Sequence, residues 1–245
     1  MTLNLASITL TSSREAIIGD ALKTVASWVD ASILIDLGIE DQTVEVARSI
    51  LGDRLHIVHY DWSNGRQAYE LRNFGLEAAH RLGFNFAVTL DTDERLDPKQ
   101  CRIREGLATT EDECIEIPSS DGDYRKERFF KLPFPGRFVG KSHEHVPRET
   151  CRKAKLDIMT FWELPKTFAQ IQERSRGILP LVEEDLQGDP SNPRWHYYLG
   201  DTLFFLERYE EAEDAFRKCL DLCDSETIFR RWSLGRLAEI PMVTR

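Results

Sequence analysis

The chain has 245 residues, of which 41% are hydrophobic and 10% aromatic, a composition that supports a folded core and excludes disorder as the main state. Its formal net charge of −10 argues against nucleic acid as a partner, because binding to a phosphate backbone needs clustered lysine and arginine. The N-terminus lacks the pattern of a signal peptide and no stretch approaches the ~20 apolar residues of a membrane span, which predicts a cytoplasmic protein with at most peripheral contact to the inner membrane face.

The first ninety residues alternate short apolar runs with amphipathic stretches. Strands that are apolar throughout and that alternate with helices are typical of a parallel sheet covered on both faces. Right-handed crossovers then bring the carboxyl ends of the strands to one edge, where such sheets bind ligands. The pattern predicts strands at residues 5–10, 31–37, 55–58 and 84–90, helices at 15–29, 43–51 and 67–82, and a loop at 61–65.

The pattern changes after residue 95. Strands are predicted at 114–118 and 128–132, a polar turn at 119–123 and a loop at 133–140. From about residue 166 the chain is predicted to be helical, and Asp189-Pro190-Ser191-Asn192-Pro193 separates two helical stretches.

The helical tail carries a repeat signature. Gly200 and Ala212 have the spacing of the small residues in a tetratricopeptide unit, which let its two helices approach closely. Leu234-Gly235 recurs 35 residues after Leu199-Gly200. An array normally needs about three repeats to bury its faces, so this tail is expected to pack on the rest of the chain, a protein partner or a second copy. Tyr209, Phe216 and Leu220 also fall at the spacing of this tetratricopeptide unit. The alternative is an unrelated helical hairpin.

Two acids, Asp91 and Asp93, directly follow the apolar strand predicted at 84–90. A strand period of two places both carboxylates on the same side, at the carboxyl edge of the sheet. Unpaired carboxylates there repel one another and lose hydration, which costs stability unless a cation joins them. Oxygen ligands suit Mg²⁺ or Mn²⁺. The alternative is a helix N-cap with solvated neighbouring acids.

Four motifs in this order resemble those of the family 2 glycosyltransferases, over residues 5–165. They are Ile35-Asp36-Leu37-Gly38 followed by Asp41 and Thr43, then Arg72-Asn73, Asp91-Thr92-Asp93-Glu94, and Lys141-Ser142-His143-Glu144-His145-Val146. Several smaller bacterial members of that family also end in tetratricopeptide helices. The resemblance implies an α/β fold with a GT-A-type, mostly parallel sheet flanked by helices in a catalytic domain over 1–165, and an all-α tetratricopeptide-like tail over 166–245.

The resemblance also implies a role for each motif. The acid of the second strand reads the nucleotide base, the Arg-Asn pair lies against the diphosphate, and the His-Glu motif reaches the metal or diphosphate and the acceptor hydroxyl. The residues expected to bind the nucleotide sugar, a UDP-sugar being favoured, are Thr11, Asp36, Arg72, Asn73 and Asp91. Those expected to hold Mn²⁺ or Mg²⁺ are Asp91, Asp93 and His143. Glu144 is the first candidate for the general base and Asp123 the second.

The chemistry of these positions agrees with such roles. The carboxylate of Asp36 can accept the imide hydrogen of uracil, although a turn or N-cap acid is the competing explanation. Arg72 offers a planar fork of donors suited to phosphate, and a surface ion pair with Glu70 or Glu77 is the alternative. His143 alternates with a second histidine, so on an extended segment the two rings face the same way.

These expectations describe a metal-dependent glycosyltransferase that moves a sugar from a nucleotide-sugar donor to an unknown acceptor hydroxyl, with inversion implied by the resemblance. Two segments depart from the family pattern: Ser13-Arg14 replaces the frequent Asn-Glu, and Met159-Thr160-Phe161-Trp162 lacks a histidine that many relatives hold. The alternative is therefore a non-catalytic scaffold with a degenerate glycosyltransferase domain and a partner-binding helical repeat. Enzymes that make sugar nucleotides need a glycine-rich loop after the first strand, and residues 10–15 contain no glycine.

Overall fold

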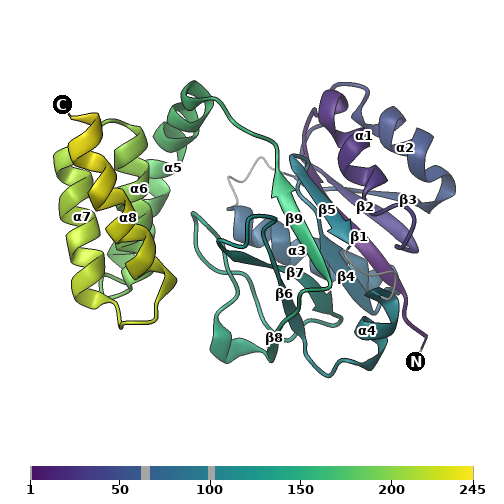
Figure 1. The fold of residues 1–245 in the computed structure, drawn as a ribbon. Coiled ribbons are helices and arrows are strands. Elements are labelled where there is room, and N and C mark those ends of the chain that lie inside the picture. The colour runs from purple at the N-terminus through teal and green to yellow at the C-terminus, as the bar shows by residue number, and fades with distance from the viewer. Residues whose placement is uncertain (1, 62–66, 99–102, 245) are drawn as a thin grey trace. The chain divides into compact units, whose positions relative to one another are not determined.

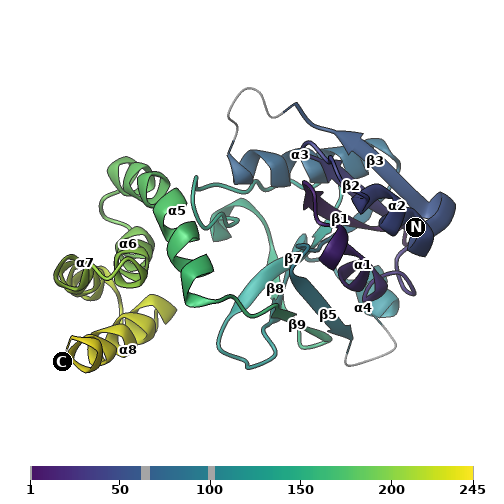
Figure 2. The same cartoon turned by 90° about the horizontal axis from the view of Figure 1, so that it is seen from above.

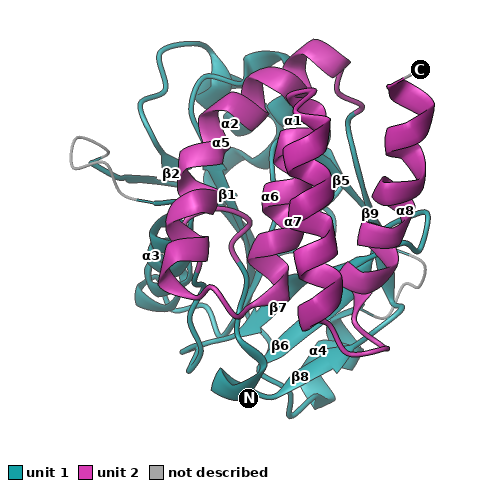
Figure 3. Ribbon diagram, turned by 90° about the vertical axis from the view of Figure 1, so that its left-hand side faces the viewer, with its two compact units in different colours: residues 1–139, 145–164 teal, residues 140–144, 165–245 magenta. Residues whose placement is uncertain are grey.

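A computed structural model describes residues 2–61, 67–98 and 103–244 (Figure 1). The chain divides into two compact units, which Figure 3 colours separately: residues 1–139 with 145–164, and residues 140–144 with 165–245. Most of the loop predicted at 61–65 lies outside the described residues.

The first unit is built on a mostly parallel sheet. Among the described residues its strand order is β3-β2-β1-β4-β7-β6-β8, and the first four of these run parallel. β7 is antiparallel to both of its neighbours, and β8 is parallel to β6. The strands are β1 (Leu5–Thr11), β2 (Ala31–Asp36), β3 (Leu55–His59), β4 (Phe86–Thr89), β6 (Cys114–Pro118), β7 (Arg125–Lys131) and β8 (Lys153–Lys155). A second, antiparallel sheet pairs β5 (Glu94–Pro98) with β9 (Met159–Glu163).

Helices cover both faces of the main sheet. α3 (Ala68–Arg81) lies on one face, and α1 (Glu15–Lys23), α2 (Thr43–Leu51) and α4 (Ile103–Thr109) lie on the other (Figure 2). The described residues of the unit also include the short 3₁₀ turns Gly52–Arg54 and Arg148–Thr150. A core of apolar side chains therefore lies on each face of the sheet, between the strands and the helices.

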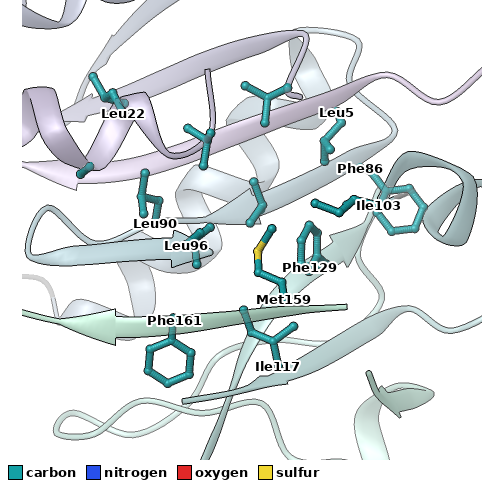
Figure 4. Close-up of a cluster of buried hydrophobic side chains, with 14 of the residues drawn as sticks. Leu5, Leu22, Phe86, Leu90, Leu96, Ile103, Ile117, Phe129, Met159 and Phe161 are labelled. Atoms are coloured by element: carbon teal, nitrogen blue, oxygen red, sulfur yellow. The ribbon is translucent and has the colours of Figure 1, made fainter. Parts of the chain in front are cut away.

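Successive residues of the central strands enter different cores. Leu5 packs in the core shared with α1, α2 and α4, whereas its neighbour Ala6 packs in the core beneath α3. Val88 and Ala87 divide in the same way on β4. Figure 4 shows the first core, where strand residues such as Leu5 meet helical residues such as Ile103. Because both faces are buried, most strand positions are apolar, and the buried hydroxyls of Ser7 and Ser32 bond to each other at 2.6 Å.

The second unit is helical. It contains α5 (Phe168–Gly188), α6 (Pro193–Phe205), α7 (Tyr209–Leu222) and α8 (Ile228–Val243). Thr167 caps α5 by accepting from the backbone of Gln170, and Asn192 caps α6 before a proline in its first turn. A Cβ added to Gly200 on α6 would lie 2.6 Å from the ring of Phe216 on α7, so these helices are in close contact.

The predicted fold class is confirmed: a mostly parallel sheet flanked by helices precedes a helical region. Some details differ. The helix predicted at 15–29 ends at Lys23, because the next backbone N–H groups bond three residues back and tighten the chain into turns before β2. β5 and α4 were not predicted. The tetratricopeptide character of the tail stays a prediction.

Within the described ranges, no helix combines the length and the apolar character needed to cross a membrane.

We expect Gly200→Ala to lower the free energy of unfolding by about 1–3 kcal/mol, because the added methyl group has no room beside Phe216. Gly235→Ala on α8 is the control: its Cβ would meet nothing within 4 Å, and loss of a helical glycine should stabilise by about 0.5–1 kcal/mol. Urea denaturation of both variants measures the difference. Equal effects would contradict the close packing of α6 on α7.

Candidate functional site

The carboxyl ends of the parallel strands gather polar side chains. Thr11 at the end of β1 is the register partner of Asp36 at the end of β2. Thr11 is buried, and its hydroxyl donates to the carbonyl of Ser12 at 2.8 Å. β4 ends at Thr89, two residues before Asp91. This is the sheet edge at which ligand binding was expected.

Asp91 and Asp93 lie in a turn rather than on the strand. The backbone N–H of Glu94 donates to the carbonyl of Asp91 at 3.0 Å and closes this turn. Strand alternation ends at Thr89, so the turn and not the period of two sets the directions of the two carboxylates.

Two arginines hold the carboxylate of Asp91. Arg72 on α3 makes a bidentate ion pair with it, with Nη1–Oδ1 at 2.6 Å and Nη2–Oδ2 at 3.1 Å. Arg128 on β7 approaches Oδ2 at 3.4 Å. Burial raises the pKa of Asp91, but Arg72 and then Arg128 outweigh it and hold that pKa well below its usual range. The carboxylate is therefore ionised at neutral pH.

A buried charge network supports the turn from below. Glu94 is fully buried, and it is the register partner of Glu163 across the β5–β9 pair. Lys126 on β7 bridges these two acids, at 2.8 Å from Glu94, and Arg128 donates to Glu94 as well. Opposed like charges destabilise a strand pair unless a cation neutralises them, so Lys126 is what allows the two acids to face each other. The ring of Phe161 lies beside both cations.

Sequence reasoning did not find this network. Arg128 was predicted only as the first residue of a strand, and Lys126 was placed outside that strand. β7 begins earlier, at Arg125, so Lys126 and Arg128 are two residues apart on one face of it. Burial of Arg128 lowers its pKa, but Glu94 and Asp91 outweigh this and raise it. Alternating cations before an apolar run were the available signal.

Asp36 shapes the loop after β2. Its Oδ1 accepts hydrogen bonds from the backbone of Gly38 at 2.9 Å and Ile39 at 2.8 Å. Its Oδ2 lies 2.6 Å from Nδ1 of His59, an exposed side chain at the end of β3 that sequence reasoning missed. Gly38 has a φ of 97°, a conformation that favours glycine. Recognition of a nucleotide base by Asp36 stays a prediction.

Arg72 and Asn73 point to different partners. Arg72 reaches Asp91, whereas the side-chain amide of Asn73 donates to the carbonyl of Phe138 at 3.0 Å and accepts from its N–H at 2.9 Å. This reciprocal pair is buried and fixes the loop before Val139. In this structure Asn73 therefore braces a loop, and its contact with a diphosphate stays a prediction.

The base candidates lie in different parts of the chain. Asp123 is exposed in the turn between β6 and β7, where its N–H donates to Asp121 at 3.0 Å. His143 and Glu144 belong to the second unit. The His143 ring stacks on Tyr198 with centroids 3.7 Å apart, and its backbone has a φ of 47°. The roles of all three as metal ligand or base stay predictions.

The acidic turn contains carboxylate oxygens, the kind of ligand atom that a hard divalent cation prefers. Within the described part of the chain, no three His, Cys, Asp or Glu side chains form a ligand group, so there is no cage made of protein alone. Mg²⁺ sites commonly use one or two carboxylates together with substrate phosphates. Asp91 and Asp93 offer such carboxylates, but a cation at Asp91 would have to compete with Arg72 and Arg128, and the role of both acids as metal ligands stays a prediction.

Comparisons with known proteins give sequence and fold relatives. No protein-family model matches the chain. The chain is 23% identical over 212 residues to the SPbeta prophage-derived glycosyltransferase SunS of Bacillus subtilis and to glycosyltransferase SunS of Bacillus phage SPbeta, over 82% of this chain and 49% of each relative. The chain thus spans about half the length of these curated relatives.

Among solved structures, one similar chain is glucosyl-3-phosphoglycerate synthase from Mycobacterium tuberculosis in complex with Mn²⁺, uridine diphosphate and phosphoglyceric acid. The TM-score is 0.50 at 13% identity, over 72% of this chain and 78% of that one. This likeness shows the fold: the chain has a mostly parallel, GT-A-like sheet flanked by helices.

Glu94→Gln tests the buried network. Removing this charge breaks the buried ion pair of Arg128 and leaves Lys126 with Glu163 alone, and we expect the free energy of unfolding to fall by about 3–5 kcal/mol. Glu173→Gln, in a pair with Arg176 whose side chains are 78% and 59% exposed, is the control and should leave the unfolding midpoint unchanged. A Glu94→Gln variant as stable as this control would show that the network contributes nothing to folding.

Proposed function

We propose that the chain is a metal-dependent glycosyltransferase that uses a nucleotide-sugar donor. The observation that carries the proposal is the acidic turn Asp91–Glu94 at the end of β4, with the guanidinium of Arg72 held against it. This juxtaposition supports the proposal, because candidate cation ligands and a guanidinium suited to phosphate lie together at the carboxyl edge of a GT-A-like sheet. The sequence similarity to proteins named glycosyltransferase SunS supports the same activity.

The donor is proposed to be a UDP-sugar. Asp36 and Thr11 are adjacent at the ends of β2 and β1, where a carboxylate can accept the imide hydrogen of uracil. Arg72 offers two parallel N–H donors to the diphosphate in place of the carboxylate that it now holds. The structural relative solved with uridine diphosphate agrees with this choice of nucleotide.

Asp91 and Asp93 are the proposed holders of Mn²⁺ or Mg²⁺, with His143 as the further ligand that the family pattern suggests. A cation there supplies positive charge against the charge that develops on the leaving diphosphate. Lys126 and Arg128 bind Glu94 at the end of this turn, and we propose that this support preorganises the carboxylates for the cation.

Transfer needs a base for the acceptor hydroxyl. Glu144 is the first candidate and Asp123 the second, and either would take the acceptor proton as the new bond forms. A single displacement at the anomeric carbon gives inversion, as the family resemblance implies. The helical tail, proposed as tetratricopeptide-like, is the candidate surface for a protein partner or a second copy.

Asp93→Ala tests the activity. We expect this variant to lose Mn²⁺-dependent turnover of UDP-sugars, measured as release of uridine diphosphate from a panel of donors. Asp97→Ala on β5 is the matched control, because Asp97 is an exposed acid four residues further on and should retain wild-type turnover. Full activity in Asp93→Ala would overturn the mechanism.

We expect Arg72→Ala to change two affinities in opposite directions, that for Mn²⁺ alone and that for uridine diphosphate with Mn²⁺. Mn²⁺ alone should bind more tightly, because Asp91 loses the arginine that competes for it. Uridine diphosphate with Mn²⁺ should bind about 10-fold to 100-fold more weakly, because a charge-assisted contact is lost. Calorimetry measures both constants. Arg81→Ala, at an exposed pair on the same helix, is the control, and a parallel change in both constants would count against the exchange.

The arginine pair on Asp91 also favours one alternative. In a scaffold that has lost catalysis, Arg72 and Arg128 would replace the cation permanently. The calorimetric titration separates the two functions, because a scaffold gives no heat that depends on Mn²⁺ when a UDP-sugar is added.

A further inference from the structure

The segment from Gly140 to Glu144 groups with the helices and not with the sheet that precedes it in the chain. Its flanking residues, Val139 and His145, bond to each other through both backbone pairs, at 2.8 and 3.0 Å. The segment is therefore a short loop with closed ends. It carries His143 and Glu144, two residues of the proposed transfer site.

One carboxylate on α5 holds the first half of this loop. Asp185 accepts from the backbone N–H of Lys141 at 2.9 Å, from that of Ser142 at 2.8 Å and from the Ser142 hydroxyl at 2.9 Å. Ser142 is 3% exposed, so these bonds are shielded from water. Hydrogen bonds to a charged acceptor are stronger than neutral ones, and three on one carboxylate specify the direction of the loop.

Side chains of α6 hold the second half. Arg194 donates to the carbonyl of His143 at 2.6 Å, and the His143 ring lies parallel to that of Tyr198, at 6°. Arg194 itself lies over the Tyr198 ring, with 5.0 Å to its centroid. Gly140 fits where a Cβ would come within 2.8 Å of Trp195. The helices thus contact both halves of the loop, at Lys141 and Ser142 and at His143.

The loop conformation is one that needs such support. His143 has a φ of 47°, and Gly140 a φ of 93°. A side chain in the left-handed region costs on the order of 1 kcal/mol or more, and it persists only where the surroundings impose it. The contacts from Asp185, Arg194 and Tyr198 are what impose it here.

We infer that the helical tail has a catalytic function besides any partner binding: Asp185 is a positioning residue that fixes the Lys141–Glu144 loop in the shape required for sugar transfer. The inference rests on the proposed function, since it takes Glu144 and His143 as members of the transfer site. A tail that only bound partner proteins would not have this role in catalysis.

Asp185→Asn tests the inference. Amide hydrogen exchange at Lys141 and Ser142 should accelerate about 10-fold or more in the free chain, because their shared acceptor loses its charge. Turnover of the UDP-sugar that the wild type uses should fall in kcat by about 10-fold to 100-fold. The affinity for uridine diphosphate without metal should stay unchanged, because the residues proposed to bind the nucleotide belong to the first unit.

Asp185→Glu keeps the carboxylate and should restore part of kcat, whereas Glu183→Gln, at an exposed acid two residues away, should match the wild type. If Asp185→Asn does not fold, Ser142→Ala removes one of the three bonds and should lower kcat in the same direction. Faster exchange with unchanged kcat, or unchanged exchange, overturns the inference. A wild-type chain without any UDP-sugar turnover refutes the proposed function instead, and the inference falls with it.

Discussion

The constraint on which the site depends is charge balance beneath the turn after β4. Glu94 is fully buried beside Arg128 and Lys126, and neither the acid nor the cations can lie there alone without a large desolvation cost. This network fixes the backbone at Glu94, whose N–H closes the turn that begins at Asp91. The acidic turn between β4 and β5 is therefore supported by Lys126 and Arg128 of β7, and Glu163 of β9 shares Lys126 with Glu94.

Arg128 connects this support to the surface of the site. It contacts both the buried Glu94 and the more exposed Asp91, so one side chain belongs to the structural network and to the ligand-binding edge. Arg72 adds a second cation from α3. In the proposed function, a diphosphate would take the place of Asp91 at Arg72. A phosphate ligand is the natural partner for arginines that already hold a carboxylate.

The helical tail complements this arrangement in a different part of the chain. Asp185 and Arg194 bind backbone groups of the 140–144 loop and Tyr198 stacks on the His143 ring, so the helices act on the shape of the loop. A sequence that reads as a repeat module appended to an enzyme thus contains groups that shape a candidate part of the enzyme.

The sequence by itself determined the central part of the sheet: largely apolar strands alternating with amphipathic helices predict a mostly parallel sheet, and the acids after residue 90 follow its fourth strand at the edge proposed to bind a ligand. These signals are local, because burial on both faces is recorded in the residues of each strand. The tertiary structure alone decided which charged and polar side chains contact one another. The contact of Glu94 with Lys126 depends on strand register, and that of Asp185 with Ser142 joins residues 43 positions apart. No periodicity along the chain encodes such pairs, because their energy arises only when folding removes water from both partners.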